Sequence, residues 1–338
     1  MTLDVLFRIA LAFVPVILFL ASLVYLDSYK LVRLRTIIQL LVCGAAAALL
    51  SYFINRSLLL QAVVSEQVLR SVIAPVVEEV LKAVPLLLFM YARRIGFLVD
   101  AAIYGFAIGT GFALVENVYY LWAIEDASLV LWLVRGFGTA VMHGGTTAIA
   151  AILTKLLLQR SEGRAWWAFL PGLGVAFVIH SLFNHFLLSP LISAVAVIVI
   201  LPPLLVLVFA ESEKYLQSWL GSGFDLASDL LQAIRSGAFS ASRPGEYLQT
   251  LREHFEGPVV ADMLCYLRLH SELSLRAKGI LMLRENGLPV KKDADIDAKL
   301  EELRFLRKSI GRTGERALTP ILQTSSHDLW QLHLLTSE

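Results

Sequence analysis

Two adjacent carboxylates and a lysine lie inside an otherwise apolar stretch of this sequence. The stretch Ala74–Phe89 contains Glu78, Glu79 and Lys82. An ionised side chain at membrane depth costs about 2.5–3.5 kcal/mol on insertion scales, so such groups face a protein interior or a wet cavity and find partners there. Glu78 and Lys82 share a helix face, whereas Glu79 is turned by about 100°. One carboxylate can therefore pair with the lysine while the other exchanges protons with a water.

The same residues also admit a purely structural interpretation, in which a buried Glu–Lys pair sets the register of the helix. A register device needs only one carboxylate, and a second one beside it adds a burial cost without serving that purpose. The sequence therefore favours a chemical role for at least one of the two glutamates.

Three other apolar stretches carry polar groups that are candidates for the same site. One holds Glu116 and Asn117, a second holds His143, and a third holds His180 and Asn184. His180 and Asn184 share a helix face, so together they could bind an oxyanion or orient a water. Asn117 could bond a ligand, a substrate backbone or an adjacent helix. For His143 a supporting role in the site and a purely structural role stay open.

Two catalytic schemes fit these residue types. In the first, Glu78 or Glu79 activates a water that attacks a peptide carbonyl. His180 and Asn184 then stabilise the oxyanion. In the second, a bound zinc ion supplies the nucleophile. The candidate ligands of that ion are His180, His143, Glu79 and Glu116. Because these residues are scattered over four stretches and the sequence has no H-E-x-x-H motif, we favour the first scheme and expect no cofactor.

The composition is that of a membrane protein. Hydrophobic residues make up 57% of the chain and charged residues only 17%, against about 25% charged in soluble domains. The formal net charge of +1 gives no indication of a nucleic-acid partner. Seven apolar stretches approach the ~20 residues that a bilayer requires. They are residues 5–26, 35–54, 73–91, 99–122, 128–154, 165–188 and 191–210. The sequence thus predicts an all-α, polytopic membrane bundle of about seven transmembrane helices.

The two ends of the chain differ in character. Residues 1–210 contain all the long apolar stretches, whereas residues 211–338 show apolar residues at three- and four-residue intervals between Gly–Pro breaks. We therefore predict a membrane domain followed by a soluble helical domain. Cys43 and Cys265 fall one in each part, which argues against a disulfide framework and against a cysteine-based zinc site.

Lysine and arginine favour alternate loops between the apolar stretches. Lys30 and Arg33 lie in the first loop, and Arg93 and Arg94 follow the third stretch. The positive-inside rule then predicts an N-terminus outside the membrane and a cytosolic C-terminal domain. With this orientation the polar groups of the four chemically interesting stretches lie at broadly similar depth, which chance placement would not produce.

Three of these stretches resemble motifs of the PrsW family of intramembrane proteases. Glu78-Glu79-Val80-Leu81-Lys82 resembles the motif E-E-x-x-K. Phe112–Asn117 resembles F-A-x-x-E-N, and His180–His185 resembles the histidine-bearing third motif. The motifs occur in the family's order over roughly residues 70–190. More distantly, the chain is similar to the CAAX-processing and bacteriocin-processing proteases, which carry E-E-x-x-x-R and H-x-x-x-N.

The resemblance implies an intramembrane endopeptidase of the bacterial cell (inner) membrane that cleaves membrane-anchored, single-span proteins, in PrsW itself an anti-sigma factor. It implies essential glutamates, and we expect Glu78 and Glu79 to activate water with Lys82 as their charge partner. The other expected site residues are Glu116, Asn117, His180 and Asn184, with His143 in support. The first 210 residues would form the protease core in the lipid bilayer. The soluble domain would bind a regulatory protein, recruit substrate or gate the site.

Two alternatives to a glutamate-type protease stay open. The first is the zinc-dependent form of the same enzyme. The second is an ion- or proton-coupled transporter, because intramembrane Glu, His and Lys residues also build proton relays. A transporter of that kind commonly carries an internal inverted repeat, and the sequence contains no internal repeat.

Overall fold

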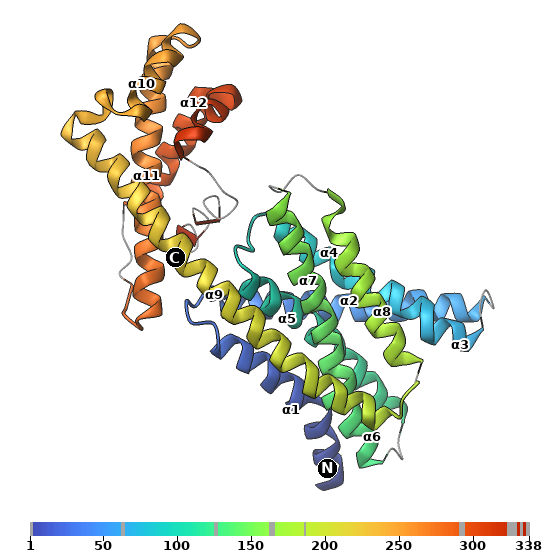
Figure 1. Ribbon diagram of the computed structural model, residues 1–338. Helices are drawn as coiled ribbons and strands as arrows, with labels where there is room; N and C mark the ends of the chain where they lie inside the picture. Colours follow the sequence, from blue (N-terminus) through green and yellow to red (C-terminus); the bar gives the residue numbers. More distant parts are fainter. Residues whose placement is uncertain are drawn as a thin grey trace. The chain divides into compact units, whose positions relative to one another are not determined.

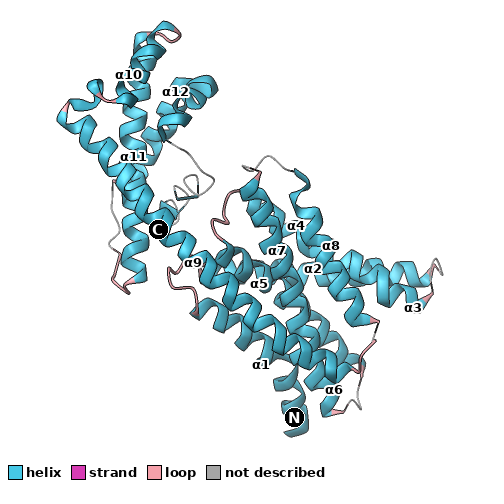
Figure 2. Cartoon of the chain, in the orientation of Figure 1, coloured by secondary structure: helices cyan, strands magenta, loops and turns pink. Residues whose placement is uncertain are grey.

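The structure is a computed structural model, and it describes residues 3–61, 65–124, 128–161, 166–185, 187–290, 295–322, 330–331 and 334–335. All regular secondary structure in these residues is helical (Figure 2), which confirms the predicted all-α class. The chain divides into two compact units, Met1–Glu213 and Lys214–Glu338. The roles predicted for residues 1–210 and 211–338, a protease core and a soluble regulatory domain, stay predictions.

The first unit is a bundle in which α5 (Leu98–Ala123) is the central helix. It packs against α2 (Leu34–Leu60) and α7 (Val141–Arg160), and α7 also packs against α8 (Phe169–Asn184) (Figure 1). The other helices of this unit are α1 (Leu3–Tyr25), α3 (Glu66–Val68), α4 (Ala74–Tyr91), α6 (Leu129–Leu133) and the first part of α9 (Pro190–Ser236). Two π-helical segments, η1 (Leu69–Ile73) and η2 (Val134–Ala140), lead directly into α4 and α7, and a 3-10 turn, η3 (Trp166–Ala168), precedes α8.

Five helices are long and apolar enough to cross a membrane, when only the described residues are considered. They are Val5–Tyr25, Leu34–Leu60, Leu98–Ala123, Leu129–Arg160 and Pro190–Ser236. The other two predicted spans correspond to α4 and α8. The first has 18 residues but contains three ionisable side chains, and the second has only 16 residues. Residues 165 and 186 of the predicted span 165–188 lie outside the described residues. The structure therefore supports five of the seven predicted spans.

Small residues let α5 and α7 approach each other until their backbones touch. A Cβ atom on Gly109 would overlap the backbone carbonyl of His143, and one on Gly105 would overlap that of Thr147. Such small-residue contacts are a common way to bring helices together in membranes. The close approach places the end of α5 that carries Glu116 beside the start of α7.

A buried acid and a buried lysine close the loop between α4 and α5. The Asp100 carboxylate accepts hydrogen bonds from the backbone N–H groups of Gly96 and Phe97 at 2.6 and 2.7 Å. Lys155, an electrostatic partner of Asp100, donates to the Ile95 carbonyl at 2.8 Å. The two side chains satisfy the backbone groups of a sharp loop, so their role there is to fix the connection between the helices.

The second unit is also helical. It contains the last part of α9, α10 (Arg243–Thr250), α11 (Gly257–Glu285), α12 (Ile296–Leu322) and two short 3-10 turns, η4 (Ala238–Ala241) and η5 (Leu251–Glu253). α11 packs against α12, and a non-helical residue, Gly311, interrupts α12 with a positive φ of 66°. Buried leucines on the facing sides of these helices form its core, as the three- and four-residue spacing of apolar residues predicts.

Candidate active site

Glu79 on α4 is the centre of a hydrogen-bonded cluster in the first unit. Its Oε1 accepts from Lys82 Nζ at 2.5 Å. The same oxygen lies 2.8 Å from Nδ1 of His180 on α8. Thr146 Oγ1 of α7 lies 3.3 Å from this oxygen and 3.2 Å from the His143 carbonyl, and its single proton serves one of the two. Glu79 is only 2% exposed. Lys82 and His180 thus hold one carboxylate oxygen, which fixes the orientation of the carboxylate and compensates its charge.

The hydrogen bond to Glu79 determines which ring nitrogen of His180 carries the proton. A carboxylate only accepts hydrogen bonds, so Nδ1 of His180 carries the proton that it shares with Glu79. In a neutral imidazole the other nitrogen then has a free lone pair. That atom, Nε2, lies 3.7 Å from Oε2 of Glu78. His180 therefore directs a lone pair toward Glu78, whose side chain is 14% exposed.

His143 on α7 is held in a similar way by a different carboxylate. Its Nε2 lies 3.1 Å from Oε2 of Glu116 on α5, and its Nδ1 lies 3.3 Å from Lys82 Nζ. The rings of His143 and His180 meet edge to face, with centroids 4.7 Å apart. Both histidines are almost completely buried. By the same reasoning, His143 donates through Nε2 and offers Nδ1 as its acceptor atom.

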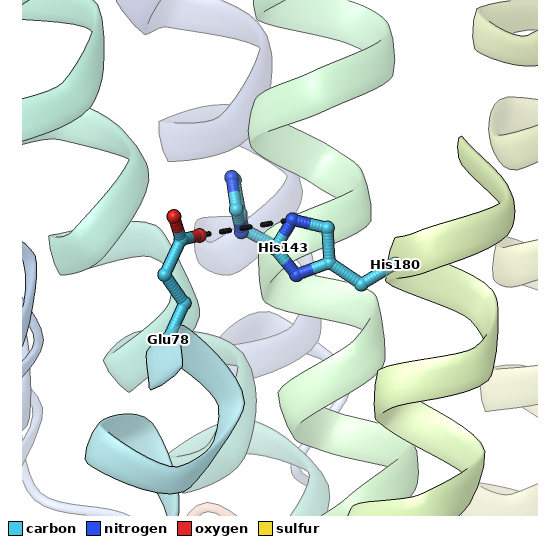
Figure 3. Close-up of side chains that lie close together, drawn as sticks. All are labelled: Glu78, His143 and His180. Atoms are coloured by element: carbon cyan, nitrogen blue, oxygen red, sulfur yellow. Dashed lines mark ion pairs between the residues drawn. The ribbon is translucent and has the colours of Figure 1, made fainter. Parts of the chain in front are cut away.

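Glu78, His143 and His180 form a possible metal-binding group. One ligand atom from each residue lies within 4.8 Å of the others. Figure 3 shows the three side chains converging between their helices, with a dashed line that joins Glu78 to His180. The zinc ligands expected from the sequence include both histidines but name Glu79 and Glu116 in place of Glu78. In the structure those two carboxylates instead accept the ring N–H groups of the histidines, Glu79 from His180 and Glu116 from His143.

The described hydrogen bonds of the two predicted asparagines do not reach the glutamates or histidines of the cluster. Asn117 donates to the Ala12 carbonyl of α1 at 2.7 Å. Asn184 donates to the Arg70 carbonyl at 3.2 Å, and its neighbour Ser181 donates to the Ser71 carbonyl at 2.6 Å. Both of these acceptors belong to η1, the π-helical turn before α4. The described contact of Asn184 therefore connects α8 to the π-helical segment that precedes α4.

Sequence reasoning missed two residues that the structure brings to the cluster. Thr146 contacts Glu79, and Arg135 contacts Glu116. Arg135 left a signal, because it is an isolated cation inside the apolar stretch 128–154 and intramembrane ionisable residues are functional candidates by default. Thr146 left no signal, since a threonine in an apolar helix costs little and is common.

Comparison with known proteins identifies the family. The model of the family described as PrsW family intramembrane metalloprotease matches residues 32–209, more than half of the chain. Comparisons with curated proteins and with solved structures give no match. The matched segment contains all three motifs and every residue of the cluster. The chain therefore belongs to the PrsW family of intramembrane proteases, as the resemblance of its motifs predicts.

Proposed function

We propose that this protein hydrolyses peptide bonds of membrane-anchored, single-span proteins at a site formed by Glu78, His143 and His180. The observation that carries the proposal is that each histidine donates one ring N–H to a carboxylate of its own. His180 pairs with Glu79, and His143 pairs with Glu116. Metal-ligating histidines almost always have such a partner, which selects the tautomer and orients the ring.

The donor set fits a divalent ion such as zinc. Catalytic zinc sites commonly use three protein ligands, drawn from His, Glu and Cys, and leave one position open. Glu78, His143 and His180 supply two imidazoles and a carboxylate whose ligand atoms lie within 4.8 Å of one another. A bound zinc ion would activate a water and polarise the scissile carbonyl.

In this proposal Glu79 and Lys82 form an ion pair that supports and orients the reactive groups. Lys82 is fully buried and compensates the charge of Glu79, which stays ionised and keeps its hydrogen bond to His180. Leaving either charge unpaired at this depth would be costly. The role differs from the water-activating role that the sequence suggests for Glu79. Because Lys82 and His180 already hold its Oε1, we assign contact with the reacting water to Glu78.

A form of the mechanism without an ion remains the second candidate. It is favoured by Lys82, whose ammonium group lies 3.3 Å from Nδ1 of His143 and already places a positive charge beside the histidines. In that form Glu78 takes a proton from water as the general base, and Nε2 of His180 faces the same water. Both forms use the same residues and differ in their need for metal.

The orientation and cellular location follow from the sequence argument and form part of the proposal. An N-terminus outside the membrane and a cytosolic second unit agree with the lysine and arginine distribution of the loops. The host membrane would be a bacterial inner membrane. The substrate segment must leave its helical conformation at the cleaved bond, since a helical peptide group is shielded by its own hydrogen bonds.

A cleavage assay with purified protein in detergent tests the proposal. Labelled single-span peptides would be incubated with wild-type protein, with Glu78→Gln, and with wild-type protein after treatment with a strong chelator. We expect cleavage that Glu78→Gln abolishes, that the chelator suppresses and that added zinc restores. Metal analysis of wild-type and His180→Asn protein provides a readout that needs no substrate.

Three other outcomes have distinct meanings. Cleavage that survives the chelator but is lost in Glu78→Gln would establish the ion-free form. Cleavage by Glu78→Gln at the wild-type rate would refute the assignment of the site. Proton-driven flux through proteoliposomes, with no peptide cleaved, would favour the transporter.

A further inference from the structure

Arg135 is a buried cation beside the candidate site that belongs neither to the three sequence motifs nor to the metal-binding group. It lies in η2, the π-helical segment before α7, and is only 8% exposed. A buried guanidinium at membrane depth is costly unless it is paired. Its partners therefore indicate why the chain keeps it.

All described partners of Arg135 are side chains from one end of α5. A terminal nitrogen, Nη2, forms an ion pair with Oε2 of Glu116 at 3.1 Å, without the geometry of a hydrogen bond. Nε donates to Oδ1 of Asn117 at 2.9 Å. The guanidinium lies over the ring of Tyr120, 3.7 Å from its centroid. A planar guanidinium can form the ion pair, donate the hydrogen bond and stack on the ring at the same time, whereas the ammonium group of a lysine cannot.

The ion pair connects Arg135 to the histidines of the site. The Glu116 oxygen that pairs with Arg135 is the same atom, Oε2, that lies 3.1 Å from Nε2 of His143. One carboxylate oxygen thus lies between a guanidinium and an imidazole. Glu116 is partly exposed and has a long, flexible side chain, so the guanidinium limits where its carboxylate can move.

The π-helical segment explains how Arg135 reaches this position. Arg135 and His143 are eight residues apart, which in a regular α-helix would separate their directions by about 80°. A π-helical turn accommodates one additional residue, so the interval behaves like seven residues and the separation falls to about 20°. The segment η2 therefore turns Arg135 onto the face of the helix that carries His143. π-Turns inside α-helices are frequent at functional sites for this kind of reason.

We propose that Arg135 is a positioning residue of the protease, which holds Glu116 as the acceptor of the His143 Nε2–H group and thereby fixes the orientation of that ring. The proposal rests on the proposed function of the Glu78, His143 and His180 site. Without the guanidinium, Glu116 can rotate away and His143 loses its acceptor. The described contacts of Arg135 all go to Glu116, Asn117 and Tyr120, so we expect its loss to act on the catalytic step.

The first test is a double-mutant cycle in the cleavage assay. Arg135→Gln is expected to lower kcat by about 10–100-fold, the usual range for partners of metal-ligating histidines, with KM unchanged. The same substitution in a Glu116→Gln background is expected to add little, because Arg135 acts through Glu116. Arg135→Lys keeps the charge without the planar guanidinium and is expected to recover only part of the activity. Arg135→Lys also replaces Arg135→Gln in the cycle if Arg135→Gln does not fold.

Lys155→Gln is the matched control, because Lys155 is an equally buried cation whose described hydrogen bond goes to the loop carbonyl of Ile95. It is expected to lower Tm without changing kcat. If Arg135→Gln lowers kcat by the same factor with and without Glu116→Gln, Arg135 does not act through Glu116 and the proposal is wrong.

The second test needs no substrate, so it separates a failure of this inference from a failure of the proposed function. Protein labelled with 15N-histidine would be studied by NMR in bicelles, with the His143 signals assigned from His143→Gln. We expect a protonated, hydrogen-bonded Nε2 in wild-type protein and in Lys155→Gln, loss of that hydrogen bond in Arg135→Gln, and a weakened hydrogen bond in Arg135→Lys. An unchanged His143 signal in both Arg135 variants would overturn the proposal. Absence of cleavage by wild-type protein would count against the proposed function alone.

Discussion

The first unit contains two buried acid–lysine combinations that look alike by composition and burial. Glu79 is 2% exposed and Lys82 is fully buried, and they lie one turn apart on α4. Asp100 is 1% exposed and Lys155 is 6% exposed, and they lie on α5 and α7. A criterion based on buried charge alone would rank the two equally.

Their hydrogen-bond partners distinguish them. Asp100 and Lys155 bond the backbone of residues 95–97, which closes the loop between α4 and α5. Glu79 and Lys82 instead contact the imidazoles of His180 and His143, which come from two other helices. Backbone partners indicate that a charge stabilises a connection. Titratable side chains as partners indicate that a charge controls chemistry. The following substitutions test this distinction, from the largest expected effect to the smallest.

Glu78→Gln is expected to cause the largest loss of activity. Glu78 belongs to neither acid–lysine combination and contacts the His180 nitrogen that is free to react. Removing it should lower kcat by roughly 10²–10⁴-fold, the usual contribution of a general acid or base, while the Tm in detergent stays close to that of wild-type protein. A variant that unfolds, or one that retains most of its activity, would contradict the assignment.

Substitutions in the Glu79–Lys82 pair are expected to reduce both activity and stability. Lys82→Met leaves the Glu79 charge buried without its cation and should destabilise the fold by about 3–5 kcal/mol. The double variant Glu79→Gln/Lys82→Met removes both charges and should recover much of this stability. It should remain impaired in cleavage by about 10–100-fold, because His180 has lost its orienting carboxylate. Thermal unfolding and kcat would be measured on the same preparations. Restored activity in the double variant would show that the pair is only structural.

Asp100→Asn is expected to affect stability alone. It weakens the hydrogen bonds to two buried backbone N–H groups, which should cost about 1–3 kcal/mol. The kcat per folded molecule should not change, since the partners of Asp100 belong to the loop. The measurements that check this are Tm and the kcat corrected for the fraction of active protein. A loss of kcat as large as that expected for Glu79→Gln/Lys82→Met would remove the distinction between the two combinations.

Asn184→Ala is expected to have the smallest effect. In the structure Asn184 donates to the Arg70 carbonyl of η1, so the substitution should slightly loosen the contact between α8 and the start of α4. Loss of an oxyanion donor, the role suggested by the sequence, would instead lower kcat by about 10²–10³-fold. Steady-state kinetics of this variant decides between the two roles.

The all-helical class, the membrane-embedded character and the family could be predicted because each depends on local features. An ionisable residue inside an apolar stretch is conspicuous, since it is costly in a membrane. For that reason the amino-acid types alone identify Glu78, Glu79, Lys82 and His180 as site candidates. The count of seven spans was less secure, because it relied on α4 and α8, and α4 contains the polar residues of the site while α8 is short.

The assignment of partners depended on the tertiary structure. Glu78 and Glu79 are adjacent, and a rotation of α4 by about 100° would turn one of them into the direction in which the other points. That rotation depends on how α4 packs and on the π-turn before it, neither of which leaves a pattern in the amino-acid types. The same holds for Arg135, which a π-turn brings onto the face of His143. Composition and motifs therefore sufficed to name the helices and most of the polar residues. The rotation of each helix about its axis results from many small packing contacts. That rotation decided which carboxylate meets which histidine.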